Sequence, residues 1–276
     1  FNAELGGEVG REIGEPIRVR VTDTLGVALA HVRTAWATTD GGSVSGGART
    51  DSAGWTEARW TLGPRAGMQR TTLSVGNPRF ISATTFRATA TPGAARRLRL
   101  VAGDAQRATV GSALPKPISL RVTDSLGNAV SGASVRAMSS AGALSDSIFS
   151  SGADGSVHMK WTLGERATAQ RVDAQLVGTE ERLALTATAR VGAPAAIELV
   201  VQRGSSRGTT RLVARVQDAH GNAVVGGAVA VAASGGKLNV MRVRTDSAGR
   251  AQVTWISSAA SRTAVRITAT VVGTKL

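Results

Sequence analysis

Apolar and polar residues alternate along short stretches of the chain, and a period of two residues indicates a β-strand with one buried face. In residues 118–123, Ile118, Leu120 and Val122 share one face and the polar residues between them share the other. Residues 94–193 contain seven such stretches separated by turn residues, which is typical of an immunoglobulin-type β-sandwich. The predicted strands lie at residues 97–101, 118–123, 135–138, 147–149, 157–161, 172–177 and 183–189.

The pattern recurs with a period of 94 to 101 residues, which is the length of a domain and too long for a solenoid unit. A shift of 101 places Trp60 on Trp161, and a shift of 94 places Trp161 on Trp255. We therefore predict an all-β protein of three tandem immunoglobulin-like β-sandwiches: repeat one at 1–93, repeat two at 94–193 and repeat three at 194–276. Phe1 aligns with Ala102, and residues 267–273 align with 172–178, so repeat one is expected to lack its first strand and repeat three its final strand.

An Asp-x-x-Gly turn follows the first strongly alternating strand of each repeat. Aspartate can accept hydrogen bonds from backbone amides ahead of it, and glycine or asparagine tolerates a positive φ. We assign these residues a structural role in the turns. Calcium binding is the alternative, but Ca²⁺ takes about 6–8 oxygen ligands and each turn offers one carboxylate. The turn residues are Asp23, Gly26, Asp124, Gly127, Asn128, Asp218, Gly221 and Asn222.

The composition argues against catalysis. The chain has no Cys, which excludes disulfides, zinc-thiolate sites and Cys nucleophiles. Its three histidines, His31, His158 and His220, share no metal-ligand spacing, and no Gly-x-Ser-x-Gly elbow is present. No run of 18 or more apolar residues could form a transmembrane helix. We therefore expect no catalytic residues, no cofactor, no metal site and no transmembrane segment.

Basic charge increases along the chain. Of the net charge of +14, repeats one, two and three carry +2, +4 and +8. Arginine on outward positions can simply solubilise a sheet and protect its edges. The alternative is docking to an acidic protein face, an anionic lipid or a glycan; nucleic acid is disfavoured because no reading helix is evident and aromatics are scarce. The candidate interface residues in repeat three are Arg211, Arg215, Arg242 and Arg244.

Tryptophan positions divide into two groups. Four of the five fall on inward positions of the alternation and predict core anchors: Trp36, Trp60, Trp161 and Trp255. Trp55 instead shares the parity of Glu57 and Arg59, which face outward. An exposed Trp suits an interface hot spot, and packing against its own loop is the alternative; Trp55 is therefore a further candidate interface residue.

Repeat three carries an ordered set of motifs. The strand ending in Asp218 leads into Gly221-Asn222-x-Val224, then Gly227, and later residues 245–251, Thr-Asp-Ser-Ala-Gly-Arg-Ala. This order resembles the bacterial immunoglobulin-like domain, group 1, the repeat of invasin- and intimin-type surface proteins. Repeat one departs from it with Val27 where the Asn belongs. The resemblance implies an exported, non-enzymatic rod in the periplasm or on the cell surface, often presenting an adhesive tip.

Three functions follow as hypotheses. The leading one is a structural or adhesive rod on a bacterial envelope that acts by protein–protein interaction. The second is an accessory extramembrane, periplasmic subunit docked on a membrane complex that it stabilises. The third and weaker one is a polyanion-binding module. Phe1 is not an initiator Met, and a removed secretion signal would explain this.

Overall fold

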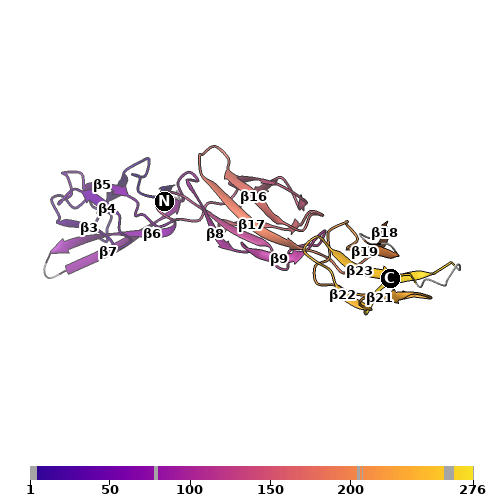
Figure 1. The fold of residues 1–276 in the computed structure, drawn as a ribbon. Helices are drawn as coiled ribbons and strands as arrows, with labels where there is room; N and C mark the ends of the chain where they lie inside the picture. The colour runs from indigo at the N-terminus through magenta and orange to yellow at the C-terminus, as the bar shows by residue number, and fades with distance from the viewer. Residues whose placement is uncertain (1–4, 78–79, 204–205, 207, 258–263, 276) are drawn as a thin grey trace.

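The computed structural model describes residues 5–77, 80–203, 206, 208–257 and 264–275. Every regular element in this part of the chain is a β-strand, as the alternation predicted. The strands form three β-sandwiches that follow one another in an elongated row (Figure 1). The all-β, tandem immunoglobulin-like architecture expected from the sequence is confirmed.

Repeat two is formed by two facing sheets with strand orders β14-β10-β8 and β13-β11-β16-β17-β9, and by a small β12-β15 pair. All seven predicted strands are present. The inward residues of both sheets meet in one core, so Ile118, Leu120 and Val122 are all fully buried. The strands are β8 (Arg97–Ala102), β9 (Gln106–Thr109), β10 (Ile118–Thr123), β11 (Ser134–Ser139), β12 (Ala143–Leu144), β13 (Ile148–Ser150), β14 (Ser156–Met159), β15 (Trp161–Thr162), β16 (Ala169–Leu176) and β17 (Arg182–Arg190).

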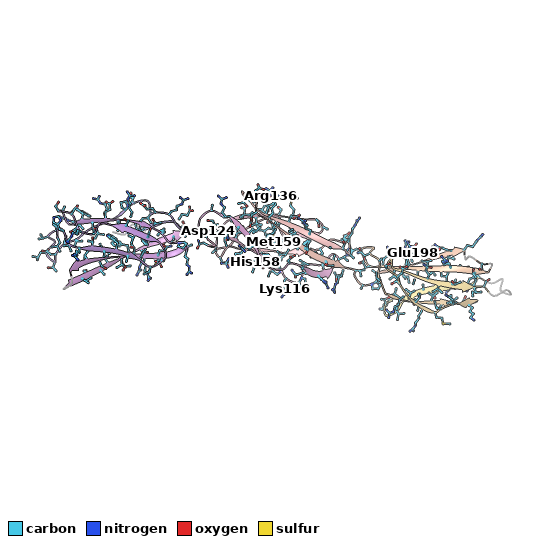
Figure 2. All side chains as sticks on the ribbon, turned by 60° about the vertical axis from the view of Figure 1, so that its left-hand side comes forward. Lys116, Asp124, Arg136, His158, Met159 and Glu198 are labelled. Atoms are coloured by element: carbon cyan, nitrogen blue, oxygen red, sulfur yellow. The ribbon has the colours of Figure 1, made fainter. Side chains whose placement is uncertain are left out.

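Three short strands were not predicted as separate elements. Strand β9 pairs in parallel with the end of β17, and β15 separates from β14 to pair with β12. Such short pairings depend on partners far away in the sequence, which local alternation does not reveal. Adjacent residues of β14 show the alternation itself: Met159 is buried, whereas His158 faces outward and its Nδ1 lies 3.0 Å from Ser119 Oγ (Figure 2).

Repeat one has sheets ordered β2-β5-β4 and β1-β7-β6-β3 around a core that includes Ile17, Trp60 and Leu62. Trp60 and Trp161 are 0% and 1% exposed, and Trp36 and Trp255 are partly buried against their cores, so the predicted anchors are confirmed. The strands are β1 (Leu5–Glu8), β2 (Ile17–Arg20), β3 (Thr34–Thr38), β4 (Ser43–Gly46), β5 (Trp55–Thr61), β6 (Gly67–Asn77) and β7 (Phe80–Thr91).

Repeat three has sheets ordered β18-β19-β23-β21 and β22-β20-β24. Its core is built mainly of small residues, with Leu212 as the largest fully buried side chain. The strands are β18 (Ala196–Arg203), β19 (Thr209–Gln217), β20 (Ala228–Ala233), β21 (Lys237–Leu238), β22 (Arg242–Arg244), β23 (Arg250–Ile256) and β24 (Ile267–Val271).

The outer repeats differ from repeat two at one sheet edge each. Strands β10 and β19 pair antiparallel with β8 and β18. Strand β2 is the counterpart of β10 and β19 in repeat one, and it pairs only with β5 among the described strands. Likewise β24 pairs only with β20 in the described part of repeat three, whereas β16 lies between β11 and β17. Strand β2 is therefore an edge of its sheet in the described part of repeat one, and β24 is an edge in the described part of repeat three.

Candidate functional site: the junctions between repeats

Each repeat has an aspartate in the turn that follows β2, β10 or β19, and the carboxylate of this aspartate stabilises the turn. Asp124 Oδ1 accepts hydrogen bonds from the backbone amides of Leu126 (2.9 Å) and Asn128 (2.8 Å). Gly127, with φ 92°, takes the left-handed position that the turn requires. Asp23 and Asp218 bind the amides two and four residues ahead of them in the same way.

The second oxygen of the carboxylate holds the linker from the preceding repeat. Asp124 Oδ2 accepts a hydrogen bond from Gly93 N at 3.0 Å, and Asp218 Oδ2 accepts one from Gly192 N at 2.9 Å. Both aspartates are almost fully buried. One side chain therefore fixes the turn and the chain that enters the repeat, and Figure 2 places Asp124 at the boundary of repeats one and two.

The asparagine of the turn reaches across the boundary, which we call the one–two junction. Asn128 Nδ2 donates to Pro64 O (2.9 Å) and to Asp124 Oδ2 (2.9 Å), while Asn128 Oδ1 accepts from Ala66 N (2.8 Å). Both ends of the amide are therefore satisfied by main chain of the preceding repeat.

The boundary of repeats two and three, the two–three junction, has the same geometry. Asn222 Nδ2 donates to Glu165 O (2.7 Å), and Asn222 Oδ1 accepts from Ala167 N (3.0 Å). The amide also binds the Asp218 carboxylate at 3.0 Å. The two junctions thus use one set of contacts.

A buried glutamine shapes the loop that receives each asparagine. Gln69 Oε1 accepts from Gly63 N (2.6 Å), and its Nε2 donates to Gly63 O and to Arg65 O. Gln170 makes the equivalent bonds to Gly164 and Arg166. Sequence reasoning missed both glutamines, although the shift of 101 that aligns Trp60 with Trp161 also aligns them.

The junction carboxylates are held in their ionised form. Burial alone would favour the neutral acid, but hydrogen bonds from Asn128, Gly93 and Leu126 outweigh it and lower the pKa of Asp124 below its ordinary value. The pKa of Asp218 is lowered by the corresponding bonds, again against the effect of burial. Both groups are therefore anionic acceptors at neutral pH, which strengthens the hydrogen bonds that they receive.

The two junctions differ at the turn position held by Leu126 in one and by His220 in the other. Leu126 lies against Gly10 at the one–two junction, where an added methyl group would be 3.8 Å from its Cδ1. His220 takes this place against Gly111, and a methyl group there would be 3.0 Å from its Nε2. His220 Nδ1 also lies 3.7 Å from Glu165 Oε1. The two–three junction is therefore the more polar and the tighter of the two.

The turn of repeat one has no asparagine at the position of Asn128 and Asn222. Val27 occupies the position of Asn128 and is 60% exposed, and Leu25, at the position of Leu126, is 86% exposed. The departure from the motif noted in the sequence therefore places apolar side chains at the surface of this turn.

Trp55 lies on the outer face of β5, opposite to Trp60 of the same strand. It is partly buried, because the Arg18 guanidinium carbon lies 5.5 Å from its ring centroid. Arg18 also pairs with Glu57 at 3.5 Å. The ring is thus covered in part by a side chain of its own repeat.

The four candidate arginines do not form one patch. Arg211 and Arg215 lie on the outer face of β19 beside Arg250, and Arg215 Nη1 is 3.9 Å from Glu198 Oε2. Arg242 and Arg244 lie on β22, in the opposing sheet. Their outward positions in the sequence pattern do not predict this, because alternation gives the face of a strand and not the sheet to which the strand belongs.

No group of three or more His, Asp or Glu side chains suitable for a metal ion occurs among the described residues. Asp51, Asp154 and Asp246 lie in their own turns and accept hydrogen bonds from backbone amides ahead of them. The described residues also include no helix of the length and hydrophobicity that membrane crossing requires.

No protein family model and no curated protein matches the chain. Solved structures do. FdeC, described as a broadly conserved Escherichia coli adhesin, is 21% identical with a TM-score of 0.59, over 99% of this chain and 91% of that one. Yersinia pseudotuberculosis InvD is 16% identical with a TM-score of 0.51, over 96% of this chain and 81% of that one.

Invasin, described as a bacterial integrin-binding protein, aligns over 97% of this chain and 55% of its own, at 17% identity and a TM-score of 0.49. At these sequence identities, structural similarity indicates a shared fold only. FdeC and InvD, which have the higher TM-scores, align with nearly the whole chain and therefore with its three repeats together. The resemblance drawn from the repeats is confirmed at the level of the fold: the chain has the tandem immunoglobulin-like fold of FdeC and InvD.

Proposed function

We propose that this chain is a stiff, non-enzymatic rod of a bacterial surface protein, which spaces or presents an adhesive region and acts by protein–protein contact. The observation that carries the proposal is the repeated junction. An anionic Asp and a neighbouring Asn hold the linker and the preceding repeat at both boundaries. Inter-domain motion is the default for domains joined by a small interface, so a joint that is built twice from the same contacts favours a mechanical role.

The comparisons support a place outside the cytoplasm. FdeC, whose fold the chain shares along nearly its whole length, is described as an adhesin. The chain contains no Cys nucleophile, and no group of side chains that could hold a metal ion occurs among the described residues. An exported, surface-exposed rod accounts for these features together.

Contacts with a partner fall on two outer faces in this proposal. One is the face of β5 and β2 that carries Trp55 and Arg18, and the other is the face of β19 and β23 that carries Arg211, Arg215 and Arg250. Partly desolvated Trp and Arg side chains are common anchors of protein interfaces. Arg242 and Arg244 would serve a separate contact on the opposing sheet.

Cross-linking in intact cells, followed by mass spectrometry, tests the function. The proposal expects links to copies of the same protein or to material outside the cell. Links concentrated on integral membrane proteins of the same cell would overturn it and identify an accessory subunit. A steep loss of the links with rising salt would instead identify binding to a polyanion.

A further inference from the structure

A shallow basic groove lies on the outer face of repeat three. Its volume is about 270 Å³, and it is lined by three arginines, two valines and two glutamines, with no acidic residue among them. Strand β19 lies between β18 and β23, so the floor of the groove is formed by three strands that pair with one another. The face is therefore a built surface of one sheet and not a gap between loops.

The register of these strands sets the outer side chains in three rows. Alternate residues of a strand point the same way, and residues four positions apart are about 13 Å from each other, so Arg211, Val213 and Arg215 share this face. An uncharged central row therefore separates two rows that contain arginine. The rows are Glu198, Arg215 and Arg250; then Val200, Val213 and Gln252; then Gln202, Arg211 and Thr254.

Repeat three does not balance the charge of this groove. It contains three acidic residues, which are Glu198, Asp218 and Asp246. Asp218 is buried at the two–three junction, and Asp246 accepts hydrogen bonds from two amides of its own turn. Glu198 Oε2 lies 3.9 Å from Arg215 Nη1, which is too long for a hydrogen bond.

Two of the three arginines have no acidic partner among the described residues. Neither Arg211 nor Arg250 belongs to an ion pair in that part of the chain. Arg250 also lies directly opposite Arg215, and a like-charge pair in this position is unfavourable in an antiparallel sheet. An anion that contacts both guanidinium groups would relieve this repulsion.

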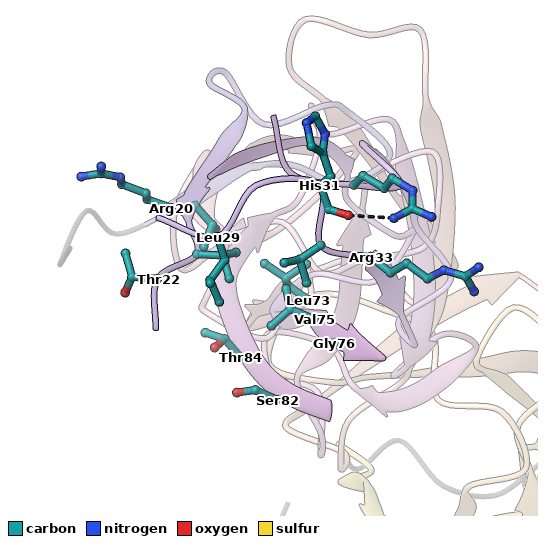
Figure 3. A pocket seen from close by; sticks show the side chains of 14 residues that line it. Arg20, Thr22, Leu29, His31, Arg33, Leu73, Val75, Gly76, Ser82 and Thr84 are labelled. Carbon is teal, nitrogen blue, oxygen red and sulfur yellow. Dashed lines mark hydrogen bonds between the residues drawn. The ribbon is translucent and has the colours of Figure 1, made fainter. Parts of the chain in front are cut away.

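Two arginines of repeat one show how such groups are satisfied within a repeat. Arg18 of β2 pairs at 3.5 Å with Glu57, which lies opposite it on β5. By the repeat alignment these two positions correspond to the central row of repeat three, which holds no charge. Arg49 Nη1 instead donates to the main-chain oxygen of His31 at 2.7 Å, the dashed bond of Figure 3.

We propose that the groove of repeat three binds an acidic, extended segment of the partner protein, in which two carboxylates flank an apolar side chain. This inference rests on the proposed protein–protein contact and names the chemistry of the partner. Residues i, i+2 and i+4 of an extended segment point to one side and span about 13 Å, which matches the spacing of the two arginine rows. One carboxylate lies between Arg215 and Arg250, the apolar side chain lies over Val213, and the second carboxylate contacts Arg211.

The central row favours a protein segment over a uniformly charged polymer. Val200 and Val213 are partly buried and offer no polar group to an anion. A polymer that carries a charge on every unit would place charge over these valines, where its lost hydration is not compensated. Gln202 and Gln252 can both donate to and accept from the main chain of a bound segment.

The test uses a fluorescently labelled peptide, Thr-Glu-Thr-Val-Thr-Glu-Thr, whose Glu and Val side chains share one face when it is extended. Its affinity for the whole chain is measured by fluorescence anisotropy at low ionic strength. Arg211→Glu should weaken binding about tenfold or more, because it removes a charge-assisted contact and adds repulsion. Arg242→Glu is the matched control: it makes the same charge change on β22, in the opposing sheet, and should change the affinity less than about twofold.

Two further measurements locate the peptide. The methyl signals of Val200 and Val213 should shift in NMR spectra when the peptide is added. A peptide with Thr in place of its Val should bind several-fold more weakly, because it loses apolar contact with the central row. Urea unfolding of repeat three checks that both Arg→Glu variants keep the stability of the parent chain.

Three results would overturn the proposal. One is an equal loss of affinity in Arg211→Glu and Arg242→Glu, and another is equal binding of the Val and Thr peptides; either would indicate diffuse attraction of anions to a basic repeat. The third is no detectable binding at millimolar peptide. None of these results bears on the rod itself, because cross-links in intact cells test that function independently.

Discussion

Asn128 of repeat two donates a hydrogen bond to the main-chain oxygen of Pro64 in repeat one, 2.9 Å away and 64 residues earlier in the chain. Asn222 makes the same contact with Glu165 at 2.7 Å. In each case the amide oxygen accepts from the backbone two residues further on, at Ala66 or Ala167. Because one side chain joins its own turn to the preceding repeat, a single substitution can test the stiffness of each junction.

Substitution Asn128→Ala should loosen the one–two junction. It removes three side-chain hydrogen bonds, each contributing about 0.5–1.5 kcal/mol. The chain has no native Cys, so spin labels on engineered Cys pairs can report distances across each junction. The distance distribution between repeats one and two should broaden.

Asn222→Ala is the matched control. It should broaden distances across the two–three junction and leave those across the one–two junction unchanged, because the two amides share no partner. Narrow distributions in both variants would show that the asparagines do not set the junction geometry.

Acid should loosen both junctions. A carboxylate whose pKa is lowered on folding stabilises the folded state above its ordinary pKa of about 3.9, and this stabilisation is lost as the pH falls through the lowered value. For Asp124 and Asp218, whose pKa values are lowered, distances should stay constant from pH 8 to about 5 and broaden below about 4. In the Asp124→Asn variant, the distance distribution across the one–two junction should already be broad at pH 7. The distribution across the two–three junction should still broaden on acidification.

Gln170→Ala should destabilise repeat two. Gln170 is 3% exposed and satisfies Gly164 N and the oxygens of Gly164 and Arg166. Leaving buried main-chain groups unpaired costs about 1–3 kcal/mol, so β16 and β17 should exchange amide protons faster and unfold at lower urea concentration. The conservative variant Gln170→Glu keeps the acceptor but loses the donor, and it should recover only part of the loss. Equal stability of all three proteins would contradict the bracing role.

Substitution of the two tryptophans of β5 should destabilise repeat one to different extents. Trp60→Ala removes a side chain that is 0% exposed, and large-to-small changes of this kind cost about 3–5 kcal/mol. Trp55→Ala removes a partly exposed ring and its contact with Arg18, which contributes about 0.5–1 kcal/mol at an exposed site. Urea unfolding of repeat one should separate them clearly. A cost for Trp55 close to that of Trp60 would show that Trp55 anchors the core and is not available for a partner.

The turn aspartates show which junction contacts the sequence can predict and which it cannot. The Asp-x-x-Gly motif predicts that Asp124 binds amides a few residues ahead, and the structure places Oδ1 there. The bond from Oδ2 to Gly93 could not be predicted, because it depends on where the linker passes in three dimensions. The same holds for Asn128, whose partners in the preceding repeat are main-chain atoms that leave no residue-type signal.

The arginines of repeat three show that alternation does not assign a strand to its sheet. Alternation placed Arg211, Arg215, Arg242 and Arg244 on outward positions, but their strands lie in different sheets. A pattern of period two cannot distinguish the two layers of a sandwich, since both have an inner and an outer face.

The sequence by itself predicted the repeated pattern, the seven longer strands of repeat two and the Asp-x-x-Gly turns, because alternation and turn chemistry act over a few residues. Tertiary structure alone decided how each repeat is held to the next and which strand edge of repeat one is open. Those features depend on contacts such as Asn128 with Pro64, and on whether Val21 has a strand opposite it as Val122 does. Main-chain partners distant in the sequence are chosen by packing, and packing is a property of the folded chain.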